Sequence, residues 1–368
     1  MKVLMIEYFY PENTYTQELG EAMGAGMDVT IACKKKAALP ESLAVKWKNM
    51  VYEGYHSKLT APVLYGYSLM QIAAEIRRGH YDVVNIQYMR DAKYEIPFFA
   101  RMKKHCGLLV NTVHTILPHE ATEEDRRLHQ RLYDLCDLLI VHNQTCKRLL
   151  MEDYGVPEKK LCVIPHGVYP QAERPPRQRG ARTEYLMFGQ IRKYKGLDVL
   201  LKALACLSDQ ERALLHVTVA GPQYLKLDDT DYEALARQLG VADCVTFLRR
   251  HIPVEEHAAL FDGTDICIFP YKELYGSGSL LMAYSFDKPV IVSEDPIFRE
   301  ETNGGKTGLL FSKDDPSALA EAIRQTMGWS EEDYAARRGA VRRMKREKYS
   351  WDRAASILQE AFSEALKP

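Results

Sequence analysis

A basic loop that leads into a helix is the most informative stretch of the sequence. The run FGQIRKYKGLDVLL (188–201) begins as a strand, passes Arg192 and Lys195, and enters a helix near Gly196. A helix N-terminus offers unpaired N–H donors and a positive dipole end, which favours a phosphate. The arginine fork and the lysine charge beside it suit a diphosphate. A solvated basic loop has the same spacing, so the loop alone leaves both interpretations open.

A second turn of this kind lies in the run FPYKELYGSGSLLMAYSFDKPVIVS (269–293). A strand ends in Gly- and Ser-rich residues, and Ser277, Gly278 and Ser279 open the next helix. Glycine lets backbone N–H groups approach a ligand closely, so this turn is a second candidate anion cradle. Glu273 lies just before it and is either a surface charge or a ligand contact. Two such turns and a carboxylate suit a nucleotide diphosphate that carries a polyhydroxylated group.

His114 is the candidate catalytic residue in the first half of the chain. It ends the strand-like run LLVNTV (108–113) and is followed by Pro118 and His119. A histidine after a strand is often structural. Here, however, the carboxyl end of the strand points it toward the expected ligand side of the sheet.

Other chemical motifs fail on their spacing. The first strand–helix turn has no G-x-G-x-x-G, and NGGKTG (303–308) has Glu300 where a phosphate-binding loop needs its first glycine. Asp229 and Asp231 could ligate a divalent ion, but they precede a helical run and fit helix capping better. No pair of the eight cysteines forms C-x-x-C, so we expect reduced core thiols. The sequence thus predicts no bound metal and no cofactor.

The composition describes an ordinary globular protein of two domains. The 368 residues are 46% hydrophobic, and 49 basic residues balance 50 acidic ones. This balance argues against a nucleic-acid binder, which carries a basic surface. The N-terminal apolar stretch is too short for a signal peptide, and no apolar run approaches the roughly 18 residues that span a bilayer. We expect a cytoplasmic protein, and peripheral membrane contact stays open.

The elements that must hold these residues alternate between short apolar strands and longer amphipathic helices. Strand-like runs of the first half lie at 2–8, 27–33, 81–87, 108–113, 138–143 and 161–166, with helical stretches at 67–79 and 123–136. Those of the second half lie at 184–189, 214–221, 243–248, 265–271, 289–293 and 307–311, with helices at 196–207, 254–261 and 316–327. Strand–helix–strand repetition predicts parallel sheets covered on both faces.

We therefore expect an α/β protein of two doubly wound, Rossmann-like domains that face each other across a ligand cleft. The Pro-, Gly- and Arg-rich run 171–183 reads as the linker between a first domain (1–170) and a second (184–350). Two helices, around 330–348 and 351–366, end the chain. We expect the segment 351–368 to return to the first domain.

Taken together, these motifs resemble the retaining family-4 glycosyltransferases of the GT-B fold, the glycosyl transferases of group 1. The runs that carry the resemblance are FGQIRKYKGLDVLL, VAGPQ, FPYKELYGSGSLLMAYSFDKPVIVS, TGLLF, VHTILPHE, VIPHGVY and YSWDRAASILQEAF. They extend over nearly the whole chain. The resemblance implies a role in polysaccharide or glycoconjugate biosynthesis, with the acceptor at the first domain and a nucleotide sugar at the second.

The resemblance also implies roles for single residues. Arg192 and Lys195 would bind the donor diphosphate, helped by backbone N–H groups around Ser277 to Ser279. Glu273 would hold sugar hydroxyls, and His114 would contact the donor sugar. Gly221 would let the donor pass close to the backbone. The segment from Arg250 to Ile252 would line the base.

Two departures from the family pattern stand out. Gln190 occupies the place of the first arginine in G-R-x(n)-K-G, so Arg192 must take that role. In the E-x7-E pair, Met282 stands for the second glutamate, which usually holds the ribose hydroxyls. The first aligns at Leu274, one residue after Glu273.

The leading hypothesis is transfer of a sugar from a nucleotide-diphosphate donor to a hydroxyl of a saccharide, a lipid-linked saccharide or a small metabolite. A nucleotide-sugar epimerase on the same fold is one alternative. A non-catalytic nucleotide-sugar-binding partner subunit is another, motivated by the incomplete carboxylate pair. The sugar, the base, the acceptor and the oligomeric state are not readable from one sequence.

Overall fold

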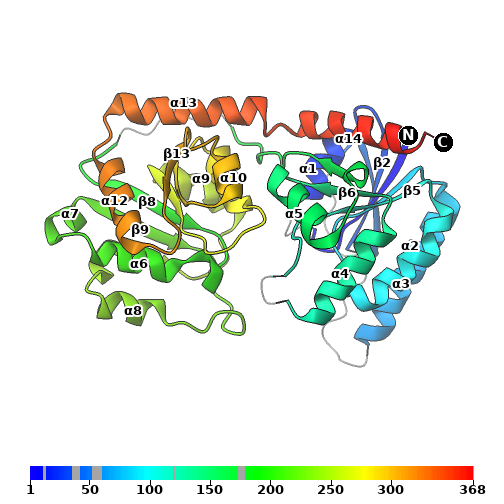
Figure 1. Cartoon of the computed structure of the whole chain (residues 1–368), viewed down its shortest axis with the longest axis horizontal. Coiled ribbons are helices and arrows are strands. Elements are labelled where there is room, and N and C mark those ends of the chain that lie inside the picture. Colours follow the sequence, from blue (N-terminus) through cyan, green and yellow to red (C-terminus); the bar gives the residue numbers. More distant parts are fainter. Residues whose placement is uncertain (11–13, 35–41, 52–59, 119–120, 173–178, 368) are drawn as a thin grey trace. The chain divides into compact units, whose positions relative to one another are not determined.

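A computed structural model describes residues 1–10, 14–34, 42–51, 60–118, 121–172 and 179–367 (Figure 1). The chain divides into two compact units, Met1–Gly167 with Tyr349–Pro368, and Val168–Lys348. The boundary expected at residue 170 thus falls just inside the second unit, and residues 349 and 350 belong to the first. Part of the expected linker, 173–178, lies outside the described residues, as does His119.

The first unit contains a seven-stranded sheet of order β3-β2-β1-β4-β5-β6-β7, in which each described pairing is parallel. Its strands are β1 (Lys2–Ile6), β2 (Asp28–Lys34), β3 (Val45–Val51), β4 (Val83–Ile86), β5 (Leu108–Thr112), β6 (Leu138–Val141) and β7 (Leu161–Val163). Apart from β3, they are the strands that the sequence predicts. A parallel sheet brings the carboxyl ends of all its strands to one edge.

Strand β3 escaped the sequence analysis because it is only half-buried. Its sequence, VKWKNMV, buries Val45 and Val51 and leaves the five residues between them partly or fully exposed. A strand at the edge of a sheet has one free side, so lysines are tolerated there and the apolar signal weakens. β3 pairs with β2 from Val29↔Val45 onward.

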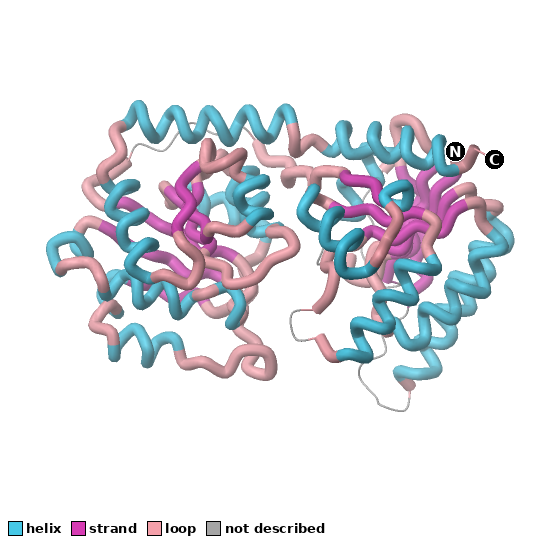
Figure 2. The backbone as a smooth tube through the Cα atoms, viewed as in Figure 1, coloured by secondary structure: helices cyan, strands magenta, loops and turns pink. Residues whose placement is uncertain are grey.

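Helices cover both faces of this sheet (Figure 2). They are α1 (Tyr15–Met23), α2 (Ala61–Gly79), α3 (Ala92–Met102), α4 (Glu123–Leu135), α5 (Gln144–Tyr154) and α14 (Trp351–Ala365), with short 3-10 turns at Lys103–His105 and Glu158–Lys160. The step from β1 to β2 goes toward one edge of the sheet, and the steps from β4 to β5 and β6 go toward the other edge. Because crossovers between parallel strands are right-handed, α3 and α4 lie on the face of the sheet opposite α1. On the α1 side, Leu358 and Phe362 of α14 enter the core.

The second unit has a six-stranded sheet of order β10-β9-β8-β11-β12-β13, again with parallel pairings. Its strands are β8 (Thr183–Phe188), β9 (Leu215–Ala220), β10 (Val245–Leu248), β11 (Ile266–Phe269), β12 (Val290–Ser293) and β13 (Gly308–Phe311). Its helices are α6 (Leu197–Ala205), α7 (Asp209–Ala213), α8 (Tyr232–Gln238), α9 (Val254–Asp262), α10 (Gly278–Ser285), α11 (Pro296–Glu301), α12 (Pro316–Met327) and α13 (Glu331–Glu347), with 3-10 turns at Lys193–Lys195 and Ala242–Cys244. All six strands and the helices predicted for this half are present.

Side-chain caps explain where several of these helices begin. Thr122 and Ser330 form capping boxes at α4 and α13, and Asp315 accepts N–H bonds at the start of α12. Such a cap satisfies donors that the first helical turn leaves unpaired. The local sequence therefore fixes these starts without help from distant residues.

All eight cysteines are free thiols, and six of them are buried; the prediction of core thiols is wrong for Cys106, which is half-buried, and for Cys206, which is exposed. Within the described residues, no helix combines the length and the hydrophobicity of a membrane span.

Candidate functional site

Three loops meet at the carboxyl end of the second sheet. The loop after β8 approaches the loop after β11 so closely that a Cβ on Gly196 would lie 1.9 Å from the carbonyl oxygen of Pro270. Gly196 has φ +70°, which glycine adopts readily, and it begins α6. The backbone N–H of Lys272 donates to the carbonyl oxygen of Tyr194 at 2.7 Å. The two predicted anion turns are thereby joined into one site.

Gly221 holds the third loop in place. With φ +151°, it lies against Gly189, and a Cβ on Gly221 would come within 2.1 Å of the Gly189 carbonyl oxygen. Its lack of a side chain is thus already required by the packing of the chain on itself. Passage of the donor beside it stays a prediction.

Lys195 is the central residue of this site. Its side chain is 8% exposed, and its Nζ lies 5.2 Å from the centroid of the Tyr271 ring. Burial lowers the pKa of Lys195, and the nearby Arg192 lowers it further. In the described part of the chain no carboxylate pairs with Lys195. A buried cation gains stability from a nearby anion, which makes Lys195 the centre of a candidate anion site.

Gly189 allows this lysine to reach the second turn. A Cβ on Gly189 would lie 3.0 Å from Lys195 Nζ and 2.4 Å from Ser279 Oγ. Lys195 and Ser279, far apart in the sequence, therefore flank the same backbone position. The sequence analysis did not include Gly189 in the site; its place at the end of a strand was the available signal.

Arg192 and the start of α10 complete the cationic side. Arg192 is half-buried, and its guanidinium lies 5.7 Å from the ring centroid of Tyr194. Ser277 caps α10 by accepting the N–H of Leu280 at 3.1 Å, so the helix starts at Gly278 as expected. Burial raises the pKa of Tyr271 to about 12, so this hydroxyl stays protonated beside the serines.

The two positions of the family's carboxylate pair, Leu274 and Met282, follow strand β11. Glu273 is exposed on the loop between β11 and α10, whereas Leu274 is buried and Met282 is half-buried. The family's carboxylate pair therefore has no equivalent at those two positions. Glu273 is left as the carboxylate of this loop.

The remaining predicted positions are placed as follows. Arg250 binds Glu256 through two nitrogens, at 3.0 and 2.5 Å, and the side chain of Ile252 is buried. Asp231 caps α8 through the N–H of Ala234, and Asp229 pairs with Lys193. The capping interpretation of this acidic run holds for Asp231.

The first unit gathers three histidines at the carboxyl edge of its sheet. His114, His142 and His166 follow the neighbouring strands β5, β6 and β7, and Tyr15 at the start of α1 contacts all three rings. Only His114 was predicted from sequence, although the other two also follow apolar strands. Burial lowers the pKa of all three, to about 4 for His142 and about 3 for His166. The cluster is therefore neutral near pH 7.

Hydrogen bonding selects the tautomer of His114. His142 Nδ1 lies 3.3 Å from the carbonyl oxygen of Ile164, which can only accept, so this nitrogen carries the proton. His142 Nε2 then accepts from His114 Nδ1 at 3.4 Å, which leaves His114 Nε2 unprotonated. The Oε1 atom of Gln87 lies 3.4 Å from His114 Nε2. The amide nitrogen of Gln87 is buried and has no hydrogen-bond partner among the described residues. Turning that amide supplies the missing donor.

Glu7, directly after β1, is a further buried group at this edge. The backbone N–H of Phe9 donates to its Oε1 at 2.6 Å, and the Thr16 hydroxyl donates to its Oε2. Its carboxyl group is fully buried, and burial raises its pKa to about 7. The sequence analysis missed Glu7.

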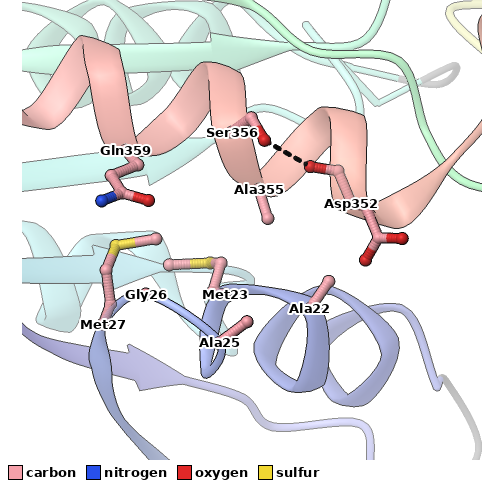
Figure 3. Close-up of a pocket in the computed structure, with 9 residues that line it drawn as sticks. All are labelled: Ala22, Met23, Ala25, Gly26, Met27, Asp352, Ala355, Ser356 and Gln359. Atoms are coloured by element: carbon pink, nitrogen blue, oxygen red, sulfur yellow. Dashed lines mark hydrogen bonds between the residues drawn. The ribbon is translucent and has the colours of Figure 1, made fainter.

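A separate hollow of about 300 Å³ lies between the end of α1 and α14 (Figure 3). It is lined by Ala22, Met23, Ala25, Gly26, Met27, Asp352, Ala355, Ser356 and Gln359. Its walls are mostly small or apolar, and the Ser356 hydroxyl donates to the backbone of Asp352. The lining brings together no group of charged side chains that resembles the lysine site. Within the described residues, no group of three or more His, Cys, Asp or Glu is arranged to hold a metal.

Comparison with known proteins agrees with this architecture. Residues 182–328 match the model for glycosyl transferases group 1, and residues 13–172 match the model for glycosyltransferase family 4. The sucrose-phosphate synthase of Thermosynechococcus elongatus superposes with a TM-score of 0.75 at 18% identity, covering 99% of this chain and 98% of that one. Anabaena HepE in complex with UDP and glucose gives 0.73 at 15% identity, covering 99% and 100%. The fold is GT-B.

Curated relatives include D-inositol 3-phosphate glycosyltransferases. That of Corynebacterium aurimucosum is 28% identical over 311 residues, which cover 78% of this chain and 72% of the relative. That of Corynebacterium jeikeium is 30% identical over 66% of this chain and 61% of the relative. The chain belongs to the family-4, group 1 glycosyltransferases.

The raised pKa of Glu7 makes stability depend on pH. Its folded pKa of about 7 exceeds the ordinary value of 4.5, so the protonated form is favoured in the folded state. This contribution is complete below pH 4.5 and is lost as pH rises to about 7. Relative to Glu7→Gln, we expect wild-type unfolding free energy to fall by about 3 kcal/mol across this window and then level off.

Urea unfolding of both proteins at a series of pH values measures this difference. Glu124→Gln, at an exposed position on α4, serves as the control and should show no comparable trend. A flat difference between wild type and Glu7→Gln would show that Glu7 ionises normally in the folded protein.

Proposed function

We propose that this glycosyltransferase uses a nucleotide-diphosphate sugar as donor and transfers the sugar with retention of its anomeric configuration. The observation that carries the proposal is Lys195, a buried cation with no carboxylate partner among the described residues, next to Ser279 and Arg192. A diphosphate supplies the anion that these groups lack. The UDP and glucose held by Anabaena HepE support this choice of donor class.

The reaction that we propose needs no protein nucleophile. The bond from the anomeric carbon to the diphosphate oxygen breaks, and the acceptor oxygen bonds to the same face of that carbon. The acceptor proton passes to the departing diphosphate oxygen. The protein positions both substrates and stabilises the charge on the leaving group through Arg192 and Lys195. Glu273 is the carboxylate that we assign to the sugar hydroxyls.

The proposal includes three classes of acceptor, each to be tried in transfer assays: a saccharide, a lipid-linked saccharide and a small metabolite. The curated relatives are D-inositol 3-phosphate glycosyltransferases, which favours including polyol phosphates among the small metabolites. The two family models describe glycosyltransferases, which favours transfer over epimerisation.

The proposed donor class and metal independence are tested together. We expect nucleoside diphosphates and their sugars to raise Tm in a thermal-shift panel, since a ligand at 100 times its Kd adds about 2.7 kcal/mol of stability. Sugar transfer should then persist in EDTA, because the cations and helix N-termini neutralise the diphosphate. Loss of activity in EDTA with recovery in manganese would show a metal requirement.

Release of a free epimer would show an epimerase, and absence of both transfer and donor hydrolysis would favour a non-catalytic subunit.

The diphosphate assignment is tested by Lys195→Met and Arg192→Ala. We expect each to lower kcat/KM by about 10²–10³, the scale of one lost contact to developing charge. Lys195→Met removes an uncompensated buried charge, so the Tm of the unliganded protein should not fall. Lys193→Ala, in the same loop but paired with Asp229 at the surface, is the matched control and should stay near wild type. Wild-type rates for both site variants would refute the assignment.

We assign His114 to the donor sugar: its Nε2 exchanges the Gln87 amide for a sugar hydroxyl, or its neutral ring stabilises charge at the anomeric carbon. We expect His114→Ala to lower turnover by roughly 10²-fold, while nucleoside diphosphate binding, made by the second unit, is unchanged. His105→Ala, a half-buried histidine away from the cluster, is the control. A variant that loses Tm but keeps its turnover per folded molecule would place His114 among structural residues.

A further inference from the structure

A buried carboxyl group links two segments of the first unit that follow strand β1. Glu7 is fully buried, and its two oxygens have different partners. The backbone N–H of Phe9 donates to Oε1 at 2.6 Å, and the hydroxyl of Thr16 donates to Oε2. Phe9 lies two residues beyond Glu7, whereas Thr16 is in the first turn of α1. One side chain therefore connects the end of β1 to the start of α1.

Helix α1 depends on this long-range contact because its start lacks a local one. Its N-cap residue, Thr14, makes no side-chain capping hydrogen bond, in contrast to Thr122 at α4 and Ser330 at α13. A buried carboxyl group also costs free energy that an apolar side chain at the same place would not. Glu7 thus contributes two directional hydrogen bonds rather than hydrophobic stabilisation.

Tyr15, the neighbour of Thr16 in the chain, is the first of two rings that hold His114. Its side chain is fully buried at the centre of the histidine cluster. The ring centroids of Tyr15 and His114 lie 4.7 Å apart, and the two rings are inclined at 88°. A displacement of the first turn of α1 would therefore move a ring against which the imidazole packs.

Tyr88 is the second ring, and it is connected to Glu7 through Phe9. The Phe9 and Tyr88 ring centroids lie 5.2 Å apart at an interplanar angle of 90°. The Tyr88 ring in turn stacks on His114, with centroids 4.2 Å apart and an angle of 7°. The imidazole of His114 thus has one ring parallel to it and, in Tyr15, one ring perpendicular to it.

We propose that Glu7 is a positioning residue for His114. Through its two hydrogen bonds it fixes the places of the Tyr15 and Tyr88 rings, and these rings orient the imidazole. Aromatic packing tolerates a range of ring geometries, so the hydrogen bonds supply the restraint that packing lacks. A displacement of about 1 Å can cost roughly 10²-fold in rate, so a residue remote from the substrate can control turnover. The inference rests on the role proposed above for His114.

Turnover of variants at the two ends of the link tests this role. Thr16→Val removes one hydrogen bond with little change in volume, and Glu7→Leu removes both. We expect each to lower kcat per folded molecule by roughly 10- to 10²-fold, with the Kd of nucleoside diphosphates unchanged. Glu7→Gln should recover most of the turnover lost in Glu7→Leu, because its amide can accept from the Phe9 N–H and donate to the Thr16 oxygen. Thr30→Val, which removes a buried hydroxyl of β2, is the matched control and should turn over as wild type does.

Two further measurements separate positioning from general destabilisation. In a His114→Ala background, Thr16→Val should cause little further loss of turnover, because both changes act through the same ring. Nitrogen NMR of isotope-labelled protein reports the protonation and hydrogen bonding of imidazole rings. The His114 signal, assigned from its loss in His114→Ala, should shift in Thr16→Val, whereas the signal of His216 in the second unit should not.

An unmoved His114 signal, or wild-type kcat in both Thr16→Val and Glu7→Leu, would overturn the proposal. Additive losses in the double variant would also overturn it, as would loss of turnover by Thr16→Val when His114→Ala is fully active. If the protein transfers no sugar, the proposed function fails and the NMR signal decides this inference alone. A shift of the His114 signal in Thr16→Val then supports positioning by Glu7.

Discussion

Close contact between backbone segments at glycines determines the geometry of the second unit's site. Gly196 lies against the carbonyl oxygen of Pro270, and Gly221 lies against that of Gly189. A side chain at either position would push apart loops that follow different strands. These contacts bring Lys195 to Ser279 and remove the lysine from water. The electrostatic properties of the site thus depend on the absence of two side chains.

Burial disfavours the charged form of side chains in both units, but the chemical consequence differs between them. In the second unit it destabilises the charge on Lys195, so the cation gains most from an anion that enters the site. In the first unit it keeps His114, His142 and His166 neutral and able to form directional hydrogen bonds. A neutral imidazole can contact a sugar without competing for the diphosphate. Desolvation therefore separates the two roles that the proposed reaction needs.

The same logic explains why some polar groups are poor candidates for chemistry. Arg250 is exposed and bound to Glu256, and Asp229 is exposed and bound to Lys193. Surface ion pairs of this kind contribute little and leave both charges satisfied. Lys195 differs because no carboxylate among the described residues satisfies it.

The sequence by itself determined the elements and their order. The alternation of apolar and amphipathic runs located twelve of the strands and the starts of α4, α10, α12 and α13, because this signal depends on neighbours along the chain. A basic loop before a helix singled out Arg192 and Lys195, a strand end singled out His114, and the family resemblance added their roles. Tertiary structure decided what sequence spacing cannot express: the edge position of β3, the burial of Lys195 and Glu7, and the grouping of three histidines from three strands. Burial and proximity arise from residues distant in the sequence, so no local pattern encodes them.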